Sequence, residues 1–224
     1  MSTRTYGLSP AITVTALLAL AGCATQQQPP QNWDGLELRP VKGLDAVYLR
    51  PGVEFEAYKS VMIDPVVVAF DKDWDPNSAE KDLSRQLGAR DVQRIKDEMA
   101  AGFREVFVKE LGEGGYTVVE QPAADTLRVM PGLTDVYINA PDKMSPGRTY
   151  TFAMDAGRMT LVMELRDGPS GQILGRIVDR KVGNNTGVMQ IANSVTNSAD
   201  FRRAVETWAR QLRNGLDRLN ARAG

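Results

Sequence analysis

Hydrophobic residues along this chain follow two different periods, and the change between them predicts the secondary structure. Residues 60–70 form a run of β-branched and other apolar side chains, typical of a strand buried on both faces. Pro65 interrupts that run and predicts a bulge or an exposed edge. Residues 159–166 place the apolar side chains Met159, Leu161, Met163 and Leu165 at every second position, which is typical of a strand. Residues 167–171 form a turn before a return strand over 173–182. Further strands are expected at 116–120 and 126–138.

Two other segments change to the helical period. Residues 89–111 place apolar side chains at spacings of three and four, with Gly88 as the expected N-cap and Gly112 near the end. Residues 199–220 repeat the pattern, with Ser198 as the expected N-cap. The stretches 71–87, 139–150 and 183–197 are expected to be loops. This order of elements predicts an α+β fold with a single, mainly antiparallel sheet and two helices packed on one face.

The N-terminus carries a different signal. Arg4 precedes an apolar run over residues 11–21, and the run ends in Leu20-Ala21-Gly22-Cys23. A short apolar run after a positive residue indicates a secretory signal, because a membrane-spanning helix needs about 20 apolar residues. The four residues resemble the lipobox of bacterial lipoproteins, which implies cleavage before Cys23 and a diacylglyceryl group on its thiol. An ordinary signal peptide with an incidental cysteine is the alternative.

Cys23 therefore divides the chain into three parts. Residues 1–22 are expected to be the signal peptide, residues 23–43 the lipidated cysteine and a flexible polar tether, and residues 44–224 a periplasmic α+β domain. Ala24 after the cysteine, in place of aspartate, favours the outer membrane over the inner membrane. Acyl chains, palmitate among them, gain about 0.8 kcal/mol per buried methylene, so such an anchor would be permanent.

Composition removes several classes of function. The 27 basic and 28 acidic residues nearly balance, so no nucleic-acid partner is expected. The chain has no histidine and one cysteine, which excludes Ser-His-Asp and Cys-His catalysis and the usual zinc sites. The acidic stretch 71–77 resembles a calcium loop, but Pro76 occupies the position that needs glycine. No metal and no cofactor is expected.

Four residues are candidates for contact with a partner or ligand. Asp64 and Asp135 lie within apolar strand patterns, where a buried carboxylate could act as an acid or could pair with an arginine. Trp33 and Trp74 lie in expected loops and could face a partner or lipid, or pack on the core.

From about Leu44 onward the order of these features resembles a family of bacterial lipoproteins known as domain-of-unknown-function family 3313. The residues that carry the resemblance lie at 60–66, 133–136, 164–174, 179–180 and 208–213. The resemblance implies no catalytic residue, since the family has none established.

The leading hypothesis is a non-enzymatic lipoprotein of the cell envelope, held in the outer membrane through Cys23, that binds an unidentified envelope protein or lipid. One alternative is a carrier or sensor of an apolar ligand, with methionines such as Met99, Met130 and Met163 lining a pocket. Another is a cell-wall hydrolase that uses Asp64 and Asp135, provided that both face one open cleft. The partner and the oligomeric state are not predicted by the sequence.

Overall fold

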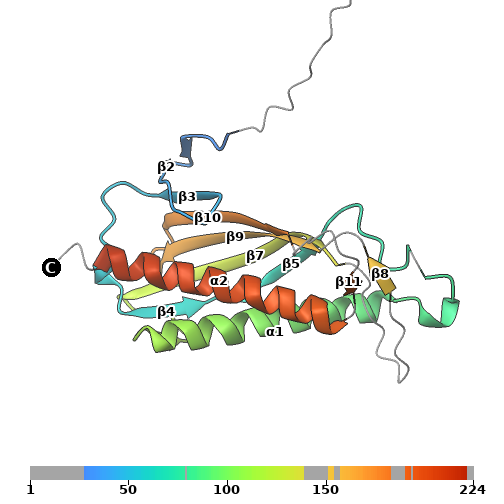
Figure 1. The fold of residues 1–224 in the computed structure, drawn as a ribbon. Coiled ribbons are helices and arrows are strands. Elements are labelled where there is room, and N and C mark those ends of the chain that lie inside the picture. Colours follow the sequence, from blue (N-terminus) through green and yellow to red (C-terminus); the bar gives the residue numbers. More distant parts are fainter. Residues whose placement is uncertain are drawn as a thin grey trace, which may run out of the picture.

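The structure, a computed structural model, describes residues 28–78, 80–138, 151–153, 157–182, 190–192 and 194–220. One nine-stranded sheet forms the body of the domain, and two long helices lie side by side across one of its faces (Figure 1). The expected α+β architecture is confirmed. In chain order the elements are β1 (Asn32–Trp33), β2 (Leu36–Leu38), β3 (Ala46–Leu49), η1 (Phe55–Ala57), β4 (Ser60–Ile63), β5 (Val67–Phe70), η2 (Leu83–Arg85), α1 (Ala89–Glu113), β6 (Thr117–Val119), β7 (Thr126–Tyr137), β8 (Thr151–Ala153), β9 (Arg158–Asp167), β10 (Ile173–Val182), β11 (Gln190–Ala192) and α2 (Ser194–Asn220).

The sheet is antiparallel on one side of β7 and parallel on the other. Its order is β1-β2-β3-β10-β9-β7-β4-β6, and every pair from β1 to β7 is antiparallel. Both β4 and β5 pair with β7 in the parallel sense, β4 with residues 126–129 and β5 with residues 132–136. They form one strand interrupted at residues 64–66, which is the break that Pro65 predicted within 60–70.

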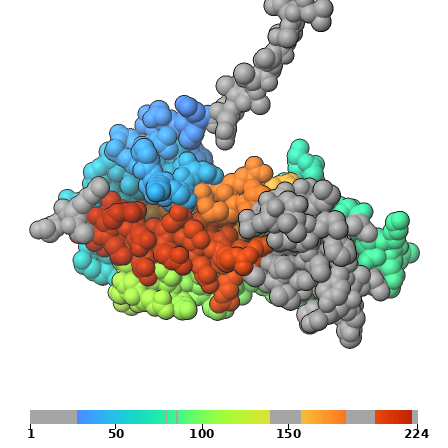
Figure 2. All heavy atoms as spheres, in the orientation of Figure 1, coloured from blue at the N-terminus to red at the C-terminus, as the bar shows by residue number. Residues whose placement is uncertain are grey.

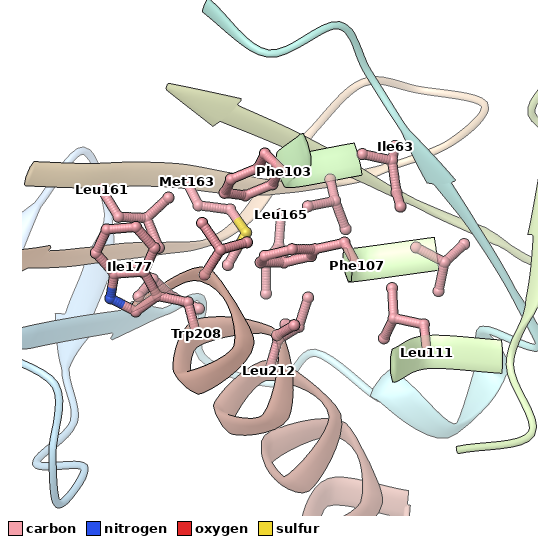
Figure 3. Close-up of a cluster of buried hydrophobic side chains, with 14 of the residues drawn as sticks. Ile63, Phe103, Phe107, Leu111, Leu161, Met163, Leu165, Ile177, Trp208 and Leu212 are labelled. Carbon is pink, nitrogen blue, oxygen red and sulfur yellow. The ribbon is translucent and has the colours of Figure 1, made fainter. Parts of the chain in front are cut away.

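The two helices run parallel to each other and close the hydrophobic core against the sheet. Their direction follows from paired contacts, since Arg202 binds Glu105 near the start of α2 and Arg213 binds Glu110 further along. Figure 3 shows the buried layer between helices and sheet. Its fully buried members include Phe103, Phe107 and Leu111 from α1, Trp208 from α2, and Leu161 and Met163 from β9.

The N-terminal residues join the sheet earlier in the chain than expected. The strands β1 and β2 lie inside the range 23–43 that we assigned to the lipidated cysteine and tether, and Leu36 is completely buried. Leu36 packs with Ala46 and Tyr48 in a second, smaller cluster, separate from the main core. We therefore place the start of the folded domain near Gln31.

A second difference concerns the expected loop over residues 183–197. Part of it forms β11, which pairs with β8, and α2 begins at Ser194. The N-cap expected at Ser198 is therefore wrong, because the helix extends one further turn toward the N-terminus. The expected loop over 139–150 lies outside the described residues.

Candidate functional site

The lipobox residues Leu20, Ala21, Gly22 and Cys23 lie outside the described residues, so their role stays a prediction. The first candidate that the structure places is Trp33. It ends β1 and precedes a tight turn at Asp34-Gly35, where both residues have positive φ angles of 53° and 76°. Two successive positive φ angles are the signature of the hairpin turn that Asp-Gly favours. Trp33 therefore lies in a β-hairpin and not in the expected loop.

The indole of Trp33 lies on a network of charged side chains. The guanidinium carbon of Arg176 lies 3.9 Å from the ring centroid, and Tyr48 meets the ring edge-on at 5.5 Å. Arg176 is only 6 % exposed, and it binds Asp34 at 3.1 Å and Glu164 at 2.7 Å. The hairpin is thus attached to β9 and β10 through one buried guanidinium.

Glu164 is the centre of this network, because it accepts hydrogen bonds from two arginines. Arg166 donates at 2.6 Å and Arg176 at 2.7 Å. Burial alone would raise the pKa of Glu164, but the hydrogen bonds from Arg176 and Arg166, with their positive charges, lower it below its ordinary value. The carboxylate is therefore held in its ionised form as an acceptor.

Asp64 follows β4 at the point where the strand is interrupted. Its side chain is nearly buried and accepts a hydrogen bond at 2.6 Å from Arg128 of β7. Its backbone N–H bonds the carbonyl of Val129, which fixes the register at the break. The sequence left open whether Asp64 acts as an acid or pairs with an arginine, and the structure shows the arginine pair.

Asp135 lies in a different environment. It has a positive φ of 50° at the irregularity of β7 between Thr134 and Tyr137, and it is exposed. The backbone N–H of Asp64 donates to the carbonyl of Val129 in β7. Asp135 lies six residues further along the same strand, which corresponds to about 20 Å. The two carboxylates therefore share no cleft, and the condition that we set for a hydrolase is not met.

Trp74 is half-buried in the segment that follows β5. Its ring stacks on Phe70 with centroids 3.8 Å apart, and its indole N–H donates to the carbonyl of Ile138 at 3.0 Å. Packing accounts for this residue. Near it, Asp71 binds Arg158 at 2.8 Å. Within the described ranges, no group of three or more potential ligands could hold a metal ion.

The carboxylate that joins the last helix to the sheet was not among the residues predicted from the sequence. Asp179 of β10 is 1 % exposed and accepts from the indole N–H of Trp208 at 2.6 Å and from the backbone N–H of Asp45 at 3.0 Å. Lys181 lies 2.6 Å from the same carboxylate. The sequence signal that could have indicated it is an aspartate at a core-facing position of a predicted strand, together with a tryptophan on the buried face of the last helix.

The described methionines do not converge on one pocket. Met163 and Met159 belong to the main core, whereas Met130, half-buried, pairs with Glu164 across β7 and β9 and so lies on the opposite face of the sheet. The helix layer therefore uses methionine as core filling. Over the described part of the chain, no helix is both long and apolar enough to cross a membrane.

Taken together, the described charged clusters are paired and fixed, and the geometry defines an α+β domain whose polar networks attach its N-terminal hairpin and its C-terminal helix to one sheet. Comparison with protein families gives the family directly. The model of the family described as "Protein of unknown function (DUF3313)" matches residues 30–212, so the chain belongs to that family. A comparison with curated proteins found no match.

Some solved structures resemble this chain at low similarity. PelC from Paraburkholderia phytofirmans, crystallised as a dodecamer, is 12% identical over 75% of this chain and 96% of its own, with a TM-score of 0.36. A minor lipoprotein from Acinetobacter baumannii is 10% identical over 74% of this chain and 93% of its own, with a TM-score of 0.35. At these values the likenesses carry no argument about activity or partners.

Proposed function

We propose that this protein is a lipoprotein of the bacterial cell envelope, anchored through Cys23 in the outer membrane, that holds a non-catalytic binding domain in the periplasm. The observation that carries the proposal is the sequence Leu20-Ala21-Gly22-Cys23 after an apolar run, with no second cysteine in the chain. The start of the folded domain near Gln31 supports it, because a short polar segment remains between the anchor and the sheet.

A binding or accessory role is favoured over catalysis by the state of the candidate carboxylates. Asp64 is held by Arg128, and Asp135 lies about six strand residues away from it. A carboxylate pair for glycoside hydrolysis needs a separation of roughly 5–10 Å. The separation of Asp64 and Asp135 supports a binding domain over a hydrolase built on these two residues, with an envelope protein or a lipid as its partner.

The anchor is tested by expressing the full chain in a Gram-negative bacterium beside the variant Cys23→Ser. Mass spectrometry of the N-terminal peptide should show Cys23 as the first residue, carrying a diacylglyceryl group and a further acyl chain. Density-gradient separation should place the protein with the outer membrane, and Cys23→Ser should lose both properties. An unmodified cysteine, or a membrane association that does not depend on it, would contradict the proposal.

The binding role needs a separate test in cells. Crosslinking of the anchored protein followed by mass spectrometry should recover one envelope component at a level well above abundant membrane proteins. Recovery of bulk membrane proteins alone would count against a specific partner.

A further inference from the structure

Trp33 is one of the few large apolar side chains that the described part of the domain leaves exposed. Its exposed fraction is 37 %, although neighbouring Leu36 and Tyr48 are almost completely buried. The exposure is not the result of a loose side chain. Arg176 covers one side of the ring at 3.9 Å, and Tyr48 meets it edge-on at 5.5 Å. The domain thus holds an indole rigidly with part of its surface open to the surroundings.

The backbone around this indole is equally fixed. The Asp34-Gly35 turn sets the β1–β2 hairpin, and Asp34 also binds the buried Arg176 at 3.1 Å. Leu38 donates its backbone N–H to Gln31 at 2.9 Å, which closes the hairpin at its open end. A side chain presented this way loses little conformational entropy on contact, so even a small buried area contributes to binding.

The position of the hairpin relative to the anchor limits what it can meet. Nine residues, 24–32, separate Cys23 from Trp33. At about 3.3–3.6 Å per residue, the ten steps from Cys23 to Trp33 reach about 33–36 Å at full extension. A lipid on Cys23 would therefore keep Trp33 within that distance of the bilayer surface. Such tethering makes the second contact intramolecular, so a weak attraction suffices to populate it.

We infer that Trp33 and the β1–β2 hairpin contact the headgroup layer of the membrane that carries the anchor. The chemistry fits, because an indole combines an apolar ring with a polar N–H and concentrates at membrane interfaces. The contact orients the domain. The segment with η2 and the β8–β11 pair, which lies on the opposite side of the molecule from β2 in Figure 1, then faces the periplasm. This inference rests on the proposed anchor at Cys23.

The test uses the full-length acylated protein in vesicles of phosphatidylethanolamine and phosphatidylglycerol whose acyl chains are brominated near the headgroups. Bromine quenches tryptophan emission only at short range. The variants are Trp33→Phe and, as a matched control, Trp74→Phe, whose indole stacks on Phe70 away from the hairpin. Both keep an aromatic ring at the site, and thermal unfolding verifies that each remains folded.

Brominated vesicles should quench the emission of the wild type and of Trp74→Phe, and Trp33→Phe should lose that quenching. Equal quenching of the wild type and Trp33→Phe, or none in either, would overturn the inference. Flotation of the vesicles separates this result from failure of the anchor. Protein that does not float with the vesicles contradicts the proposed function, whereas protein that floats without quenching at Trp33 contradicts the orientation alone.

Discussion

The indole N–H of Trp208 donates to the carboxylate of Asp179 at 2.6 Å, in a position where both side chains are 1 % exposed. This bond joins the last helix to β10. The same carboxylate accepts the backbone N–H of Asp45, so one buried group connects three segments that are distant in the sequence. A polar group at this depth is tolerated because its neighbours Trp208, Asp45 and Lys181 bind it.

Removal of the indole N–H is expected to destabilise the domain. Trp208→Phe keeps an aromatic ring in the core but takes one donor from the buried carboxylate of Asp179. Hydrogen bonds to charged groups contribute about 1.5–3 kcal/mol, so we expect a loss of about 2 kcal/mol in the free energy of unfolding, measured by urea denaturation. Trp74→Phe, which removes a half-buried bond to a neutral carbonyl, should cost about 1 kcal/mol or less. Equal losses in the two variants would argue against the role of Asp179.

The ion pair at the strand interruption gives a second prediction. Arg128→Gln leaves the nearly buried carboxylate of Asp64 without its cation, and loss of one partner of a buried pair costs about 3 kcal/mol or more. Because Arg128 is itself 29% exposed and water can replace it in part, we expect about 2 kcal/mol. The matched variant Arg39→Gln breaks an exposed pair with Glu37 and should change stability by less than about 1 kcal/mol. Chemical denaturation of both variants measures the difference.

Stability should fall in acid through Glu164. The pKa of this carboxyl lies below its ordinary value of 4.5 in the folded protein, because the hydrogen bonds from Arg176 and Arg166 outweigh the opposing effect of burial. A lowered folded-state pKa gives stabilisation that is complete above pH 4.5 and is lost as the pH falls through the folded-state pKa. An NMR titration of the Glu164 carboxyl carbon checks this, and a midpoint at or above 4.5 would contradict it.

The pKa of Tyr58 is shifted upward, in the opposite direction to that of Glu164. Burial, together with the carboxylate of Asp167 that accepts its hydrogen bond at 2.9 Å, raises the pKa of its hydroxyl from 10.0 to about 12. The resulting stabilisation is present below pH 10 and is lost as the pH rises toward 12. An absorbance titration compared with Tyr58→Phe identifies the group. In Asp167→Asn the pKa should move toward 10, and an unchanged value would exclude the carboxylate as a cause.

The sequence predicted the elements whose period is long and regular. The alternation over 159–166 appears in β9 as buried Met159, Leu161, Met163 and Leu165, and the helix predicted over 89–111 is α1. These predictions are confirmed because burial of one face is a property of the whole segment. They depend on no single partner.

The N-terminal hairpin could not be predicted in the same way. Its strands contain two and three residues, too few to show a period. The Asp34-Gly35 pair between Trp33 and Leu36 was a usable turn signal. The contacts that hold the hairpin to the sheet include Arg176, which lies 142 residues away from Asp34 in the sequence. The candidate site shows the same limit. Asp64 was identified as either an acid or an arginine partner, and only the register of β4 against β7 brings Arg128 beside it.

The contact between α2 and the N-terminal segment has a consequence for how the chain reaches its folded state. Gln211 of α2 donates to the carbonyl of Gly43 at 2.9 Å, and Figure 2 shows α2 lying between the N-terminal residues and α1. The helix layer that covers the core is therefore incomplete until the final 27-residue helix is available. Contacts of such long sequence separation form late. For the export that we propose, we expect the residues before α2 to reach a stable fold only after this last helix has crossed the inner membrane.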